Sequence, residues 1–216
     1  MRKVLLAVIV LLFGSAAFAQ DTPKFEAWAD YSYFRFNPQH SGYVNSASLN
    51  GGGGGVAYYF THMIGIEADF QGYGSVTQNY HIPATVPQCG AITEGTSCNF
   101  AAQANAFSYN VGPVIKFRSK HFEPFAEVEF GGVHSNTFKN LCTQFAGIGG
   151  ACATRNPSNN AFDFIIGGGI DVPVTKSIAI RVAEADFVLT RFGNAITGGN
   201  NNQSNFRYQA GVVIRF

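Results

Sequence analysis

The side chains that could do chemistry in this chain are few, and their spacing does not complete a catalytic set. His134 and Ser135 form the most suggestive pair, because a deacylase-type site needs a histidine and a serine on one face near a carboxylate. Adjacent residues of a strand point to opposite faces, so this pair does not meet that requirement. The remaining histidines fall in expected turns or connections, at positions 40, 62, 81 and 121. We therefore predict no catalytic residues and a protein that is not an enzyme.

Two glycine-rich stretches resemble nucleotide-binding loops only in composition. Residues 51–55 are followed neither by a Lys-Ser/Thr pair nor by a helical pattern, which a phosphate-binding loop requires. Residues 165–169 continue to Val172 and Pro173, where a dinucleotide-binding fingerprint would have its third glycine. We expect no cofactor. We expect the glycines of 51–55 to let a strand bend or to leave space inside the fold.

Four cysteines form the other reactive set, at positions 89, 98, 142 and 152. Their even number, together with the export signal at the amino end, predicts disulfides. The local pairs Cys89–Cys98 and Cys142–Cys152 would each close a short loop, and cross-loop pairing stays open. The sequence has no C-x-x-C, and no histidine is spaced beside a cysteine as a zinc ligand would be, so we expect no metal site.

The amino end has the three parts of a secretory signal peptide. Arg2-Lys3 form a positive region, residues 4–13 form an apolar core, and residues 17–19 form a small-x-small cleavage site. The apolar core is shorter than the about 20 residues that a spanning helix needs. We predict cleavage between Ala19 and Gln20. The chain then divides into a signal peptide, residues 1–19, and a single domain, residues 20–216.

Eight segments of the mature chain alternate between apolar and polar residues, which predicts β-strands with two different faces. The segments span residues 24–37, 51–60, 64–73, 106–117, 123–133, 161–172, 178–192 and 206–216. In the seventh segment Glu184 and Asp186 fall on the apolar parity, so we expect a β-bulge near Ala183–Ala185 that restores the phase. Pro113, in the fourth segment, predicts a local break in the ladder.

Short and long connections alternate strictly between these segments. The short ones are 61–63, 118–122 and 173–177, and the long ones are 38–50, 74–105, 134–160 and 193–204. Transmembrane barrels have short periplasmic turns and longer extracellular loops, and a last strand that pairs with the first leaves no edge in lipid. We predict an all-β fold, an eight-stranded antiparallel transmembrane β-barrel with short periplasmic turns and long extracellular loops.

The volume of the side chains decides which face of the strands points inward. An eight-stranded barrel has an interior just wide enough for side chains. One face is dominated by bulky Phe, Tyr and Ile and the other by Gly, Ser, Asp and Glu, so we place the aromatic face on lipid. The predicted lumen charge network consists of Asp30, Glu67, Asp69, Lys116, Glu127, Glu129, Asp163, Asp171, Arg181, Arg207 and Arg215. We expect structural ion pairs, because isolated buried charge is costly; a conduction path with an acidic bias is the alternative.

The signal peptide, the eight alternating segments, the sorted connections and the terminal strand that carries Tyr208 and Phe216 resemble the small eight-stranded outer-membrane barrels. The mature chain is similar to the barrel domain of outer membrane protein A. The resemblance implies a location in a Gram-negative-type outer membrane, with outer-membrane lipid as a partner. It also implies that Tyr208 and Phe216 form the assembly signal that the barrel-insertion machinery reads.

The composition agrees with a membrane-facing surface. Charged residues make up 12% of the chain and the formal net charge is +1, so nucleic acid is not an expected partner. We predict a non-enzymatic barrel with a structural or surface-interaction role, whose long loops could bind an extracellular ligand. A narrow porin-like channel for small solutes or ions is the alternative, and an envelope lipid-modifying enzyme ranks third.

Overall fold

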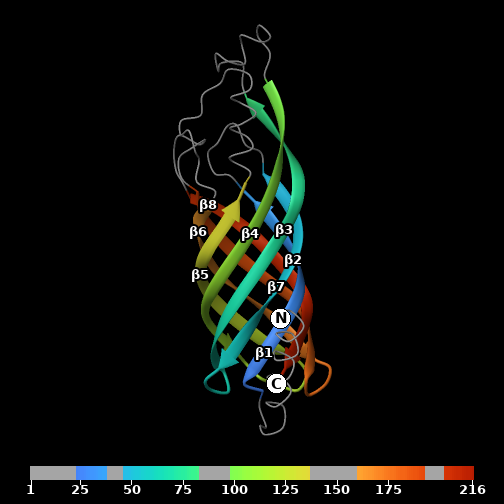
Figure 1. Ribbon diagram of the computed structural model, residues 1–216. Helices are drawn as coiled ribbons and strands as arrows, with labels where there is room; N and C mark the ends of the chain where they lie inside the picture. Colours follow the sequence, from blue (N-terminus) through green and yellow to red (C-terminus); the bar gives the residue numbers. More distant parts are fainter. Residues whose placement is uncertain (1–22, 38–45, 83–97, 137–159, 193–201) are drawn as a thin grey trace, which may run out of the picture.

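Eight antiparallel strands follow one another around a closed barrel, in which β8 returns to pair with β1 (Figure 1). The computed structural model describes residues 23–37, 46–82, 98–136, 160–192 and 202–216. The strands are β1 (Phe25–Phe36), β2 (Ala47–Tyr59), β3 (Ile64–Ile82), β4 (Cys98–Lys116), β5 (Glu123–Ser135), β6 (Asn160–Pro173), β7 (Ile178–Arg191) and β8 (Asn202–Arg215). The predicted all-β fold and antiparallel barrel are confirmed. None of the described segments forms a helix long and apolar enough to cross a membrane.

The two ends of the described chain close the barrel. The backbone N–H of Lys24 donates to the carbonyl of Phe216 at 3.1 Å, and the N–H of Phe216 donates to the carbonyl of Phe25 at 2.8 Å. The pairing continues along β1 and β8 from Glu26 opposite Arg215 to Arg35 opposite Phe206. The predicted pairing of the terminal strand with the first strand is therefore confirmed.

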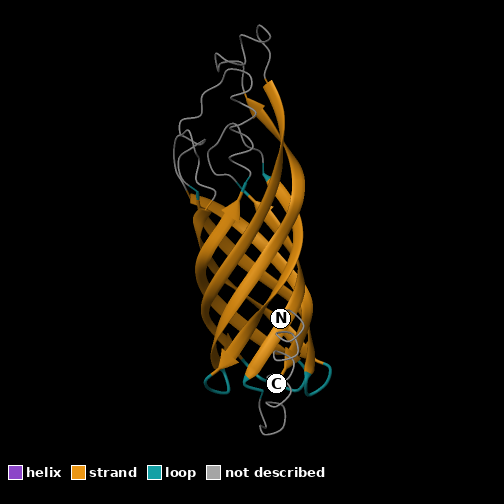
Figure 2. Cartoon of the chain, viewed as in Figure 1, coloured by secondary structure: helices purple, strands orange, loops and turns teal. Residues whose placement is uncertain are grey.

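The short connections lie together at one end of the barrel, where Figure 2 draws them as turns at the lower rim. Two of them have the same cap. The hydroxyl of Thr61 accepts the N–H of Ile64 at 2.9 Å, and the hydroxyl of Thr175 accepts the N–H of Ile178 at 3.0 Å. These side-chain bonds satisfy backbone donors where the ladder stops. We call this the turn end and the opposite rim the loop end.

The long connection expected at 74–105 was predicted wrongly at both of its ends. β3 continues to Ile82 and β4 begins at Cys98, and the two strands stay paired to the end, with a register irregularity between Tyr73 and Val76. In Figure 1 this ribbon of β3 and β4 extends beyond the ends of the other strands. The sequence there is rich in Gly, Ser, Thr, Gln and Asn, so it lacks the apolar alternation that marks a strand inside the membrane.

The bulge predicted in β7 is present one residue earlier than expected. Arg181 pairs with Gly211 of β8, but the next paired residue of β7 is Glu184, opposite Gln209. Val182 is 51% exposed on the outer face, whereas Arg181 and Glu184 are both buried. The extra residue therefore shifts the phase of the strand, so that Glu184 and every second residue after it point into the barrel.

The predicted break at Pro113 is also present. The pairs between β4 and β5 stop at Val111 opposite Phe130 and resume at Val114 opposite Glu127 without a change of register. On its other side Pro113 stays paired with Ile66 of β3. Proline has no N–H to donate, so the interruption falls on one ladder only.

The prediction that bulky apolar side chains face outward is confirmed. The prediction for the interior, which named only small and charged side chains, is incomplete. Phe70, Phe107 and Val111 are 48–50% exposed on the outer face. Among the described residues, however, the interior holds three clusters of buried apolar side chains besides its charges, and the smallest consists of Val133, Ala161 and Phe192. The turn-end apolar cluster consists of Trp28, Ala57, Tyr59, Val114, Phe125, Ala179 and Val213. The loop-end apolar cluster consists of Phe34, Ala47, Leu49, Tyr73, Ile165 and Val188.

Glycines on neighbouring strands make room for these lumenal rings. A Cβ on Gly55 would collide with the Trp28 ring, and a Cβ on Gly169 would lie 2.8 Å from Cζ of Phe125. Beside each of these two rings the adjacent strand has a glycine, which leaves room for the ring in so narrow a barrel. This supports the expectation that the glycines of 51–55 leave space.

Candidate functional site

A network of ion pairs fills the turn end of the lumen. Lys116 lies at its centre, with Nζ 2.5 Å from Oε2 of Glu26 and 2.7 Å from Oδ2 of Asp171. Arg118 reaches Glu26 at 2.5 Å and Glu123 at 3.4 Å. Each of these side chains is at least nine-tenths buried. Such pairs are strong because charge-assisted bonds form away from bulk water.

Arg215 completes this turn-end network from the last strand. Its Nη2 lies 2.6 Å from Oε2 of Glu123 and its Nε lies 3.3 Å from Oε1 of Glu26. Burial is the largest single influence and lowers the pKa of Arg118, but the charge and hydrogen bond of Glu26, together with Tyr59 and Glu123, raise it, so the pKa of this turn residue stands above its ordinary value. Arg118 therefore stays charged at physiological pH.

Aromatic rings of the turn-end apolar cluster stack on the same cations. The guanidinium of Arg181 lies 4.8 Å from the Trp28 ring and 4.3 Å from the Phe125 ring. The guanidinium of Arg118 lies 4.5 Å from the ring of Tyr59. Cation–π contacts of this kind are strengthened by the exclusion of water. Rings and ions together form one plug across the bore.

A second group of charges surrounds Arg207 in the middle of the barrel. Its Nη1 lies 2.5 Å from Oδ2 of Asp69 and its Nε lies 2.6 Å from Oδ2 of Asp186. Its Nη2 has only longer contacts, 3.5 Å to Glu184 and 3.6 Å to Glu127. With Glu67 and Glu129, these residues form what we call the central acid cluster: Glu67, Asp69, Glu127, Glu129, Glu184 and Asp186 around Arg207.

The two groups differ in charge balance. Arg181 joins them, with Nη1 2.6 Å from Oε2 of Glu184 and Nε 3.1 Å from Oδ1 of Asp171. When Arg181 and Glu184 are counted with the turn-end network, that network has four cations and four carboxylates. Among the described side chains, Arg207 is then the one cation that pairs with Asp69, Glu127, Glu129 and Asp186. Buried carboxylates without a counter-charge are costly, so this excess needs a physical explanation.

The structure places every residue predicted for the lumen network on the inner face of the barrel. Ten of the eleven are buried, and Asp30 is partly buried, where it accepts hydrogen bonds from the side-chain amides of Gln71 and Gln209 at 3.2 and 3.4 Å. The sequence prediction missed five participants: Glu26, Arg118, Glu123, Glu184 and Asp186. Glu26 could have been predicted because it lies on the polar face of its segment. Glu184 and Asp186 could have been predicted from the expected bulge, which turns them inward.

The other predicted site residues keep the status of predictions. Cys89, Cys142 and Cys152, and the cleavage position between Ala19 and Gln20, lie outside the described residues, as does the side chain of Cys98. Tyr208 lies on the outer face, where its hydroxyl donates to the carbonyl of Val182 at 3.3 Å. Phe216 pairs through its backbone with the first strand.

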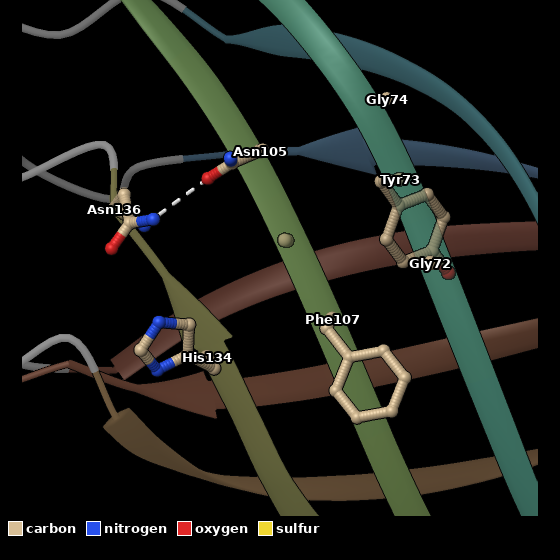
Figure 3. Close-up of a pocket in the computed structure, with 8 residues that line it drawn as sticks. Gly72, Tyr73, Gly74, Asn105, Phe107, His134 and Asn136 are labelled. Atoms are coloured by element: carbon tan, nitrogen blue, oxygen red, sulfur yellow. Dashed lines mark hydrogen bonds between the residues drawn. The ribbon is translucent and has the colours of Figure 1, made fainter.

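A pocket of about 400 Å³ opens at the loop end between β3, β4 and β5 (Figure 3). His134 and Phe107 line it, with Asn136 and Asn105 above them. Nδ1 of His134 is 2.8 Å from the amide oxygen of Asn160 rather than from a carboxylate. Ser135 points to the inner face and donates to the carbonyl of Asn105 at 2.7 Å. As predicted, the histidine and the serine occupy opposite faces, so the pocket does not bring together a serine, a histidine and an acid.

Comparison with known proteins defines the class. The chain matches the outer membrane protein beta-barrel domain over residues 5–216, so it belongs to this family, and its location is the outer membrane. No curated protein matches the sequence.

Solved structures with the same fold have very different sequences. Neisserial surface protein A covers 91% of this chain and 100% of its own, with a TM-score of 0.54 and 12% identity. OprG of Pseudomonas aeruginosa covers 90% and 97%, with 0.56 and 9%. Ail, the attachment invasion locus protein of Yersinia pestis, covers 90% and 99%, with 0.48 and 12%. At these identities, the likeness to Neisserial surface protein A and OprG shows the fold alone.

Proposed function

We propose that this protein is a non-enzymatic, non-conducting barrel of the outer membrane with a structural or surface-interaction role. The observation that supports this best is the burial of the charges inside the barrel. Lys116 and Glu129 have an exposed fraction of 0%, and Arg207 of 1%. A water-filled channel would leave such side chains hydrated, so their burial favours a lumen that is closed to ions.

The apolar clusters strengthen this argument because they lie in the same bore. Trp28 and Phe125 pack at the turn end, and Phe34, Tyr73 and Ile165 pack at the loop end. An ion crossing the barrel would have to pass both clusters and the turn-end network. Apolar constrictions oppose conduction because they exclude water.

Conductance of the full-length protein, refolded in detergent and inserted into planar bilayers, tests the closed lumen. We expect no sustained conductance steps. The double variant Trp28→Ala/Phe34→Ala removes one ring from each apolar cluster, and it should leak more than the unchanged protein if these rings block the bore. Folding of both proteins is checked by heat-modifiable gel mobility.

A narrow channel is the second candidate, and one observation favours it. The central acid cluster has more carboxylates than cations, which would select for cations in a conducting lumen. Sustained, cation-selective steps from the unchanged protein would replace our proposal with this one.

The surface-interaction part of the proposal concerns the loop end. The ribbon of β3 and β4, in which β3 ends at Ile82 and β4 begins at Cys98, extends beyond the other strands (Figure 1). Loops stapled by the predicted disulfides would lose less entropy on binding an extracellular ligand. Replacing residues 83–97 with a short Gly/Ser linker should abolish surface adhesion while heat-modifiable mobility is retained. Unchanged adhesion would leave only the structural role.

A further inference from the structure

We propose that the central acid cluster binds a calcium ion inside the barrel, held by the carboxylates of Glu127, Glu184 and Asp186 with Glu129 as a further ligand. One carboxylate oxygen from each of the first three residues lies within 4.8 Å of the others, and all three side chains are buried. Oxygens that share a Ca²⁺ ion lie about 2.3–2.6 Å from it, and so within roughly 5 Å of one another. The spacing therefore fits a shared ion.

Glu129 provides an observation independent of that spacing. Its side chain is 0% exposed, and neither of its carboxylate oxygens has a hydrogen-bond partner. It follows Glu127 by two residues on β5, so both carboxylates project from the same face of the strand. Its nearest cation is Nη2 of Arg207 at 3.9 Å, beyond hydrogen-bonding distance. A metal ion would supply the partner that Glu129 lacks.

The sheet itself provides a cradle for these carboxylates. Gly167 of β6 lies between Glu127 of β5 and Asp186 of β7, paired with both. A Cβ on Gly167 would collide with Oδ1 of Asp186. Because β6 has no side chain at this point, carboxylates from two strands that are not neighbours approach each other across it. The glycine-rich stretch of β6 therefore forms the floor of the site.

The ligand chemistry favours calcium. The cluster offers only carboxylate oxygens, which suit hard cations, and no imidazole or thiolate among the described side chains that surround it. Ca²⁺ accepts irregular geometry and six to eight oxygens, whereas Mg²⁺ demands a near-ideal octahedron. Its two positive charges would also reduce the excess of carboxylates over Arg207.

The site is enclosed on both sides. Arg181 connects Glu184 to the Trp28 ring of the turn-end apolar cluster. On the other side, Arg207 lines a small internal space together with Tyr73, Ile165 and other residues of the loop-end apolar cluster. An ion would therefore enter during folding and leave slowly. The proposed site does not depend on the role of the barrel at the cell surface.

Terbium luminescence tests the proposal on the refolded full-length protein. Tb³⁺ mimics Ca²⁺. Trp28 is the chain's only tryptophan, and Arg181 links its ring to Glu184. Excitation of the tryptophan should therefore sensitise a bound Tb³⁺. We expect saturable emission from protein refolded with Tb³⁺, at about one ion per chain, that Ca²⁺ added during refolding suppresses. Glu127→Gln and Asp186→Asn should each weaken binding at least tenfold. Glu123→Gln, the same change of charge in the turn-end network, should leave binding within twofold.

Three results would overturn the proposal. The first is the absence of saturable emission and of retained calcium, by elemental analysis, in correctly folded unchanged protein; the acids would then be neutralised by protons alone. The second is equal binding by Glu127→Gln and the unchanged protein. If the acid variants do not fold, Gly167→Ala tests the cradle without changing charge. The third overturning result is ion binding by Gly167→Ala that equals binding by the unchanged protein.

Discussion

Nη1 of Arg207 lies 2.5 Å from Oδ2 of Asp69 across the interior of the barrel, and the two side chains are 2% and 4% exposed. Arg207 belongs to β8 and Asp69 to β3, and β1 and β2 separate these strands in the sheet. The bond therefore crosses the lumen rather than following the wall. It couples β8, which closes the barrel, to β3, which comes early in the sequence. An ion crossing the barrel would have to pass this part of the bore.

Replacing Arg207 with glutamine should destabilise the barrel by about 3–5 kcal/mol, because it leaves several buried carboxylates without their cation. Urea unfolding in detergent measures the change. Arg191→Gln, on an exposed position near the loop end of β7, is the matched control and should change stability by less than about 0.5 kcal/mol. Equal effects of the two substitutions would show that Arg207 does not hold the interior together.

Gly55→Ala should cost about 1–3 kcal/mol, since overpacked interiors force side chains and backbone to shift, and here the new methyl group meets the Trp28 ring and the carbonyl of Ala68. Gly72→Ala is the control, because its Cβ would meet nothing closer than the carbonyl of Gly52 at 3.8 Å. It should be nearly neutral in the same unfolding experiment. A Gly55 variant as stable as the Gly72 variant would contradict the packing of Trp28 against β2.

Deletion of Ala183 should abolish folding, because removal of the bulge turns Glu184 and Asp186 toward lipid and leaves Arg207 without two of its partners. The folded fraction is read from heat-modifiable gel mobility. Val182→Ala keeps the bulge and changes only an outward side chain, so it should fold normally. A folded deletion variant would mean that the phase of β7 does not depend on the bulge.

Phe216→Ser should lower the amount of barrel inserted in cells while refolding in detergent stays efficient, if the terminal aromatic residue is an assembly signal rather than a structural one. Its backbone pairing with Phe25 does not need the ring. Phe122→Ser, in an exposed turn, is the control. Equal losses in cells and in detergent would assign Phe216 a structural role only.

The sequence predicted the barrel because alternation and the sorting of connections are local signals. It also predicted the bulge in β7, since Glu184 and Asp186 broke the pattern of their own strand. Parity places Trp28 on the inner face with Glu26 and Asp30, but it could not predict that the ring lies beside Gly55, because that depends on which residues of β1 and β2 are opposite each other.

The partners within the lumen network were unpredictable for the same reason. Parity placed Arg207 and Asp69 on inner faces, but their pairing across the bore depends on the curvature and stagger of the whole barrel. The extension of β3 and β4 beyond the other strands also left no apolar signal, because residues 74–82 are largely polar.

Single-channel recording from the unchanged, full-length protein in planar bilayers tests the closed lumen most directly. The buried turn-end network and the two apolar clusters predict a barrel that inserts, shows heat-modifiable mobility and gives no sustained conductance steps at either polarity. Sustained steps from folded protein, carried by cations in preference to anions, would contradict the account.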